Sequence, residues 1–179
     1  MERRTAILAF TAGTLPVFAP IFRRAANAQA PANMMPRDLG QYHTTTLMLG
    51  SFALQSSQLA TQRADLAKVK EFAGFETAEQ LTMAQVLLDT PTPPLAQLDS
   101  TRSAQLQALN SLPGGHAFDV QYVTLQLQGH RELLGAQNGF LQAQPSMSSD
   151  VAHIAMMARA TIQEHLVLLE ELRQTLGEA

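Results

Sequence analysis

Apolar and small residues recur at the spacing of one helix face in four long stretches of this chain, near residues 39–63, 67–88, 118–143 and 150–176. None of these stretches alternates polar and apolar residues as a half-buried strand does. The clearest pattern is that of the last stretch, whose face comprises Val151, Ile154, Ala158, Ile162, His165, Leu169, Leu172 and Leu176. The sequence therefore predicts an all-α protein with four long helices.

Short joints between these stretches predict how the helices pair. Residues 64–66 join the first two stretches, with Asp65 as the expected N-cap of the second helix. Pro145 separates the last two stretches, and we expect a Ser or Asp among residues 148–150 to cap the last helix. Joints of this length are typical of antiparallel hairpins, so the sequence predicts two of them.

The connection between the two hairpins, residues 89–117, is much longer. Prolines at 91, 93 and 94 end the second helix, and Asp99 or Ser100 caps a short helix that stops before Pro113. At about 1.5 Å per helical residue and about 3.3 Å per extended residue, this connection can run the length of a bundle. The expected fold is therefore a ferritin-like four-helix bundle of two antiparallel hairpins with a short extra helix in the crossover.

The first 28 residues have the pattern of a cleavable signal peptide. Arg3 and Arg4 precede an uncharged stretch at 5–22, and the small residues that follow favour cleavage after Ala28. General secretion is the preferred route, although paired arginines also occur in twin-arginine signals. The alternative is a protein anchored in the inner membrane by an uncleaved N-terminus, because the uncharged stretch is long enough to span a bilayer.

Cleavage at that point divides the chain into three parts. Residues 1–28 are the expected signal peptide, residues 29–37 form a linker with two prolines, and residues 38–179 form the helical bundle domain. We accordingly expect the mature protein to lie in the periplasm, with no integral membrane span after cleavage.

The absence of Cys and the acidic balance disfavour several functions. Without Cys, the chain cannot form a disulfide, a thiolate metal site or a catalytic thiol. The formal charge is −3, and the first 28 residues carry four Arg and one Glu, so the mature chain carries about −6. Such a chain, with no basic stripe, repels phosphate backbones. We therefore expect no nucleic-acid partner.

Three sequence blocks carry a resemblance to a known family. The motif Phe-Asp-x-x-Tyr at 118–122 opens the penultimate long helix, His130 follows about eight residues on, and His-Leu at 165–166 lies near the middle of the last helix. In these blocks, over about residues 39–176, the chain resembles an exported ferritin-like domain-of-unknown-function family of bacteria. Some members of that family are labelled putative outer-membrane or periplasmic proteins. The resemblance implies a ferritin-like fold and an exported protein.

The chain departs from this family at two places. The family commonly has an acidic pair in the first helix, where this chain has Ala53 and Gln55. It also commonly has Asp-His late in the second helix, where this chain has Glu79 and Gln80. Both departures lower the number of metal ligands that the resemblance implies for this chain.

Ligands for a metal ion are few in the predicted bundle interior. Two-metal ferritin-like sites use carboxylates from two helices and Glu-x-x-His from the other two, but this sequence contains no Glu-x-x-His. The remaining candidates are Glu76, Glu132, His130 and His165. They fit either a degenerate or mononuclear site for iron, manganese or copper, or a buried network in which each His donates to a backbone or Glu partner. The second interpretation is preferred, so we expect no cofactor.

A second group of residues lies on the outer side of the last helix. His153, Met156 and Met157 offer the imidazole and thioether ligands that copper(I) prefers. The preferred interpretation is an interface, with methionine packed beneath the short helix or a second subunit. Asp119, in the first turn of its helix, is expected to stabilise that helix end rather than to act in catalysis.

These observations predict a non-enzymatic exported protein of the cell envelope. It would act by binding or packing, as a homo-oligomer or with an envelope protein partner. The alternative is a metal-dependent redox or metal-storage protein that retains a degenerate ferritin-like site. We predict no catalytic residue, because the sequence has neither a phosphate-binding loop nor a nucleophile elbow.

Overall fold

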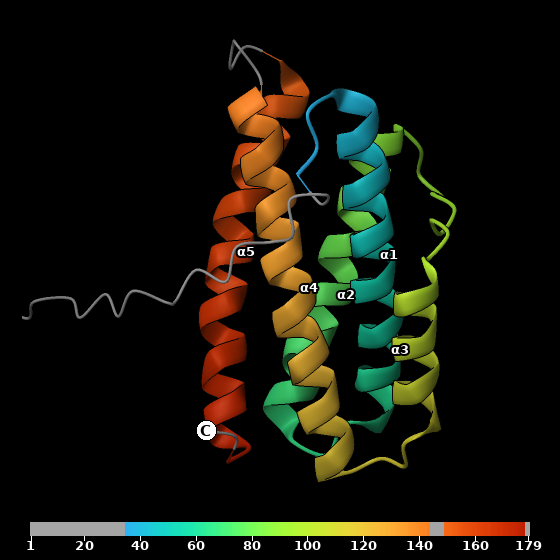
Figure 1. The fold of residues 1–179 in the computed structure, drawn as a ribbon. Coiled ribbons are helices and arrows are strands. Elements are labelled where there is room, and N and C mark those ends of the chain that lie inside the picture. The colour runs from blue at the N-terminus through green and yellow to red at the C-terminus, as the bar shows by residue number, and fades with distance from the viewer. Residues whose placement is uncertain (1–34, 144–148, 178–179) are drawn as a thin grey trace, which may run out of the picture.

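The computed structural model describes residues 35–143 and 149–177. In these two ranges the chain forms five α-helices and no strand (Figure 1): α1 (Leu39–Arg63), α2 (Ala67–Leu88), α3 (Ser100–Ser111), α4 (His116–Ala143) and α5 (Asp150–Thr175). The predicted all-α class, the four long helices and the short helix in the crossover are confirmed. The predicted signal peptide and residues 29–34 of the predicted linker lie outside the described residues.

The four long helices lie side by side as two antiparallel pairs (Figure 1). α1 packs along α2, and α4 packs along α5, as the short joints predict. The two pairs meet mainly where α1 contacts α4, whereas α2 and α5 touch over a shorter length. The short α3 lies outside this group and contacts α1 and α4. Residues 89–99, between α2 and α3, carry the chain from one end of the bundle back along its side (Figure 1).

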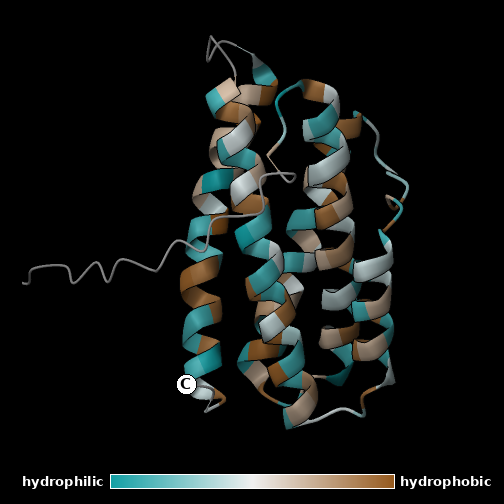
Figure 2. Ribbon diagram, viewed as in Figure 1, coloured by the Kyte–Doolittle hydropathy of each residue, from teal (hydrophilic) through white to brown (hydrophobic). Residues whose placement is uncertain are grey.

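Within the described residues, three hydrophobic clusters form the core, and each contains side chains from a different part of α4. The first contains Phe118 and Tyr122, the second contains Phe140, and the third contains Leu133, which lies between them in the chain. Hydrophobic and hydrophilic residues are mixed along all the long helices (Figure 2), because each buries one face and exposes another. The interior also contains polar and acidic side chains, Glu76, Asp119, His130 and His165 among them.

Side-chain caps begin three of the helices. The side chains of Asp38, Asp99 and Ser149 accept a hydrogen bond from the backbone N–H three residues on, at the starts of α1, α3 and α5. Such a cap satisfies one of the backbone donors that a helix leaves free at its N-terminus. The structure thus selects Asp99 and Ser149 from the alternatives that the sequence allowed.

The start of α2 is capped differently from the prediction. The N-cap is Leu66, not Asp65, and Leu66 has no side chain able to accept the hydrogen bond. The carboxylate of Asp119, from the first turn of α4, accepts from the backbone N–H groups of Asp65 and Leu66 at 2.8–3.2 Å. Asp119 therefore stabilises the N-terminus of α2 across the bundle, rather than only the end of its own helix.

The described end of the predicted linker lies against α4. Pro36 is buried, and the backbone of Met35 lies so close to Gly139 that a Cβ at this glycine would meet Met35 Cα at 3.0 Å. Glycine at 139 thus permits this close approach. Among the helices within residues 35–143 and 149–177, none combines the length and apolar character needed to cross a bilayer.

Candidate metal site

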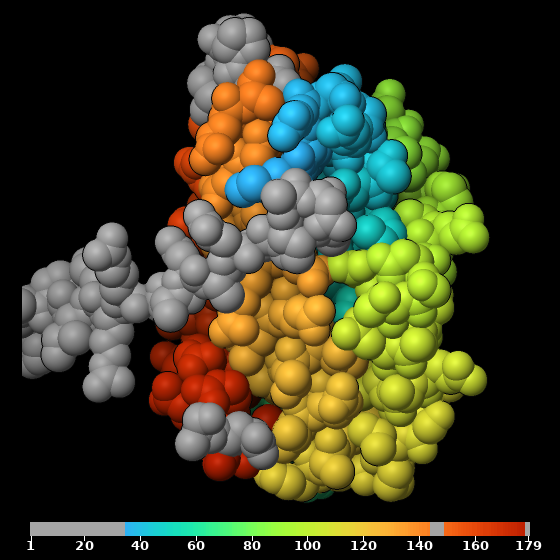
Figure 3. All heavy atoms as spheres, in the orientation of Figure 1, coloured from blue at the N-terminus to red at the C-terminus, as the bar shows by residue number. Residues whose placement is uncertain are grey.

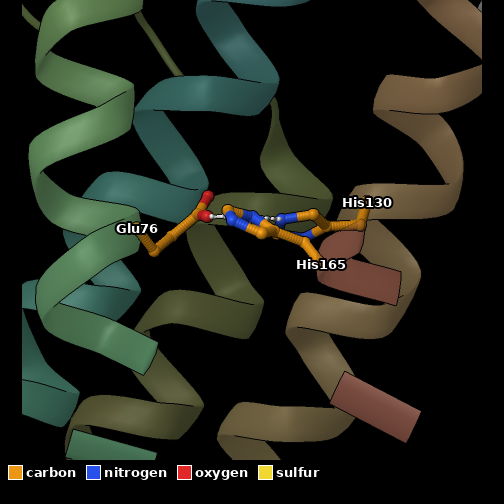
Figure 4. Close-up of side chains that lie close together, drawn as sticks. All are labelled: Glu76, His130 and His165. Atoms are coloured by element: carbon orange, nitrogen blue, oxygen red, sulfur yellow. Dashed lines mark hydrogen bonds and ion pairs between the residues drawn. The ribbon is translucent and has the colours of Figure 1, made fainter. Parts of the chain in front are cut away.

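Three of the four candidate metal ligands meet at the centre of the bundle. Glu76 on α2, His130 on α4 and His165 on α5 point toward one another (Figure 4). Glu76 Oε2 lies 3.0 Å from His165 Nδ1 and 3.3 Å from His130 Nε2, and the two ring nitrogens are 3.2 Å apart. The predicted inward positions of these residues are confirmed, because all three side chains are buried.

The remaining polar atoms of the three side chains are already held by neighbours. His130 Nδ1 lies 2.8 Å from the backbone carbonyl of Gln126, and His165 Nε2 lies 3.4 Å from a carboxylate oxygen of Glu79. Gln80 Nε2 donates to Glu76 Oε1 at 2.9 Å. In known metal sites, a carboxylate or carbonyl commonly accepts the second N–H of a ligating histidine in this way.

These outer contacts leave an excess of acceptors at the centre. A neutral His130 that donates through Nδ1 presents a lone pair at Nε2, and a neutral His165 that donates to Glu79 presents one at Nδ1. Glu76 Oε2 faces both nitrogens and accepts no well-formed hydrogen bond from the described residues. With these tautomers three acceptors face one another, and a positive charge would stabilise them, supplied either by a proton on an imidazole or by a metal ion.

The triangle has the dimensions of a metal-ligand set. Nitrogen and oxygen ligands lie about 2.0–2.2 Å from an ion such as Zn²⁺, so neighbouring ligands in tetrahedral or octahedral geometry are about 2.8–3.6 Å apart. The three distances between Glu76 Oε2, His130 Nε2 and His165 Nδ1 fall within that range, at 3.0–3.3 Å. One face of a coordination sphere therefore fits these atoms without rearrangement of the helices.

Burial and charge act against each other at this site. Burial raises the pKa of Glu76, but the two histidines outweigh it and hold the pKa of this carboxyl well below its usual range. Burial lowers the pKa of His130, but Glu76 and the Gln126 carbonyl more than compensate, so the pKa of His130 is raised. Glu76 is thus ionised at neutral pH, and its negative charge favours a positive charge beside it.

A comparison of the sequence with protein families gives one match. Residues 24–172 match the family described as Domain of unknown function (DUF4142). The chain belongs to this family. No curated protein and no solved structure matches the chain. The match confirms the resemblance to a domain-of-unknown-function family, and it includes all three residues of the central triangle.

The fourth candidate ligand of this DUF4142 protein, Glu132, does not join the triangle. Its carboxylate pairs with the guanidinium of Arg102 on α3 and accepts from Gln128 Nε2 at 3.1 Å. Arg102 also pairs with Asp99, and only 9% of its side chain is exposed. Glu132 therefore holds the crossover helix against α4 and is not among the grouped ligand atoms of the described residues.

The predicted interface residues of the DUF4142 protein separate into two groups. Met156 is half-buried and packs against a core cluster, whereas His153 and Met157 are exposed. α3 packs against α1 and α4 instead of covering these residues. The exposed pair lines a shallow depression together with Met83, Val86 and Ile154.

Sequence patterns did not reveal that two further residues of α2, Gln80 and Glu79, contact the triangle. Gln80 shares the inner face of α2 with Glu76, but its role depends on the neighbouring helix. A Cβ at Gly50 of α1 would lie 2.6 Å from Gln80 Oε1, so a glycine here leaves room for the amide that donates to Glu76. Glu79, noted only as a departure from the family pattern, contacts His165. The sequence alone does not show that Gly50 faces Gln80, because this contact depends on how α1 packs against α2.

Proposed function

We propose that this DUF4142 protein is an exported, ferritin-like helical-bundle protein that binds one divalent transition-metal ion. Glu76 Oε2, His130 Nε2 and His165 Nδ1 would hold the ion, and the role is binding rather than catalysis. The observation that carries the proposal is the buried triangle of acceptors, in which Glu76 Oε2 accepts no well-formed hydrogen bond from the described residues. An isolated buried carboxylate is costly, and a bound cation offsets that cost.

The donor set favours a particular class of ion. Two imidazole nitrogens and one carboxylate oxygen suit Fe²⁺, Mn²⁺, Co²⁺ and Zn²⁺, and sulfur, which would favour copper(I), is not among the donors. Three protein ligands leave positions of the ion open, as in known sites with two histidines and one carboxylate. One group of three ligands within residues 35–143 and 149–177 supports one ion rather than a bridged pair.

A structural ion-pair network is the second candidate function of these residues. The raised pKa of His130 favours it, because a protonated imidazole would supply the positive charge that the centre needs. In that case the three side chains would join α2, α4 and α5 without an ion. The two candidates differ in a measurable quantity, which is the metal content of the protein.

A metal inventory tests the proposal directly. Untagged protein is purified from the periplasm of the expression host, incubated with each of the four ions, desalted and analysed by mass spectrometry. We expect about one equivalent of metal in the wild type, and a loss of binding in His130→Ala and His165→Ala. His153→Ala, which removes an exposed histidine of α5, is the matched control and should bind as the wild type does. Wild-type protein that retains less than about a tenth of an equivalent of each ion would leave the ion-pair network as the function.

Export and the ferritin-like arrangement have separate support. Arg3, Arg4, the uncharged stretch at 5–22 and the small residues before Gln29 favour a cleaved signal peptide. Two antiparallel helix pairs joined by a long crossover support the ferritin-like topology. Mass spectrometry of the periplasmic product should find Gln29 at the N-terminus, and a product that still begins at Met1 would contradict cleavage.

A further inference from the structure

We propose that the metal ion enters and leaves through the seam between α2 and α5, and that Glu79 is the positioning residue at the mouth of this seam. The inference rests on the proposed function and assigns to the buried site a path to solvent. Glu79 has two roles in it. Its carboxylate attracts the cation at the surface, and its contact with His165 keeps the Nδ1 atom of that ring directed inward.

The exposure of the side chains increases in one direction from the centre. The side chains of Glu76 and His130 are 0% and 1% exposed, that of His165 is 10% exposed, and that of Glu79 is 25% exposed. Glu79 lies one turn from Glu76 on α2 and contacts the far nitrogen of His165 on α5, at 3.4 Å. The path from the triangle to solvent along these residues therefore crosses a single imidazole ring.

Three packed side chains near the triangle block other directions. The Phe72 ring lies one turn before Glu76, with its centroid 5.2 Å from that of His165 and 6.1 Å from that of His130. Gln80, one turn beyond Glu76, is 7% exposed and donates to it. On the α4 side, Gln126 is 1% exposed. Phe72 itself is 5% exposed, so an ion cannot pass beside these groups without displacing them.

The packing of the helices also favours the α2–α5 side. α1 packs along α2 and against α4, and α3 packs against α1 and α4. On the face shown in Figure 3, the crossover runs beside α1. α2 and α5 touch over the shortest length of the neighbouring long helices. A seam with few interhelical contacts opens at a lower free-energy cost than a closely packed one.

The charge at the mouth of the seam is negative. Glu79 on α2 and the exposed Glu164 on α5 lie near enough that their charges interact. A mouth lined by carboxylates concentrates cations and raises their rate of association, by about tenfold or more where the walls have a low dielectric constant. Glu79 also contacts His165, so the same side chain lies next to solvent and next to the ligand that an entering ion meets first.

Stopped-flow binding of Co²⁺ to the full mature protein tests this path. Co²⁺ bound to nitrogen and oxygen ligands absorbs visible light, so its association and dissociation can be followed separately. For Glu79→Gln, which removes the charge but keeps the shape, we expect association about tenfold slower than for the wild type at low salt. Glu79→Asp should recover part of this rate. Glu71→Gln, which removes an exposed carboxylate from the same helix, is the matched control and should associate at the wild-type rate.

The outcomes separate this inference from the proposed function. If wild-type protein binds Co²⁺ and Glu79→Gln associates at the same rate, the path through the seam is wrong and the metal site stands. If the substitution speeds dissociation alone, the role of Glu79 in orienting His165 stands and its role in cation entry is wrong. If wild-type protein binds no Co²⁺, both the site and the path fail. Circular dichroism before each experiment confirms that the variants are folded, and a variant that unfolds is replaced by Glu79→Asp.

Discussion

Two buried carboxylates of this protein have opposite surroundings. Asp119 lies at the α1–α2 joint, where both of its oxygens accept hydrogen bonds from fixed backbone N–H groups of Asp65 and Leu66. Glu76 lies at the centre of the bundle, where one oxygen accepts from Gln80 and the other faces two imidazole rings. The first carboxylate is satisfied by backbone donors, while the second is the one at which we propose that a metal ion binds.

The difference suggests how to distinguish a buried carboxylate that stabilises the fold from one that binds a ligand. Backbone donors do not change protonation and stay in place with the fold, so a carboxylate that faces them has a fixed set of hydrogen-bond partners. Imidazole rings gain and lose protons near neutral pH and are common metal ligands. A buried carboxylate that faces such rings, rather than backbone, is therefore the one at which a ligand is expected.

The largest difference between the two carboxylates should be in metal affinity. Glu76→Gln keeps the shape of the side chain but removes its charge, and it should weaken Zn²⁺ or Co²⁺ binding at least about 100-fold. Asp119→Asn should bind as the wild type does. Isothermal titration calorimetry measures both affinities. Equal losses in the two variants would mean that the triangle has no special relation to the metal.

The next effect concerns the stability of the metal-free protein. Asp119→Ala removes the acceptor of two backbone N–H groups at the start of α2, so we expect a loss of about 2 kcal/mol in the free energy of unfolding. Urea denaturation in the presence of a chelator measures this loss. Asp65→Ala, at the position where the sequence predicted the cap, should cost far less. Comparable losses in the two variants would contradict the cap from α4.

A smaller loss of metal affinity should follow when the hydrogen bond from Gln80 to Glu76 is disturbed. Gly50→Ala places a Cβ against Gln80 and disturbs the amide that donates to Glu76 Oε1. We expect metal affinity to fall about tenfold, the lower end of the range for outer-shell contacts. Gly74→Ala is the matched control, because a Cβ at Gly74 meets nothing within 4 Å. An unchanged affinity in Gly50→Ala would show that Gln80 does not position the carboxylate.

The smallest effect tests a neutral polar contact near the Asp119 end of the core. The Tyr122 hydroxyl is 2.9 Å from Ser57 Oγ, and both residues are fully buried. Tyr122→Phe should cost about 1 kcal/mol of stability and should leave metal affinity unchanged. Thermal denaturation with and without Co²⁺ measures both quantities. A change in affinity would mean that the two regions of the core are coupled.

Much of the fold follows from the sequence because helix periodicity, prolines and caps are local signals. The same periodicity placed Glu76 and His165 on inward faces and His130 beside one, and the structure buries all three. It could not place Glu132, whose partner Arg102 lies on the crossover helix, since a helix pattern does not fix where a connection packs. The cap from Asp119 was missed for the same reason, because it joins residues more than fifty positions apart.

The three residues of the triangle also belong to different halves of the chain. Glu76 comes from the first antiparallel pair, and both histidines come from the second. Neither pair alone carries the set, so these groups meet only after the two halves have docked. A metal ion could then bind only to the assembled bundle. Its binding would stabilise the docked state relative to the separated helix pairs.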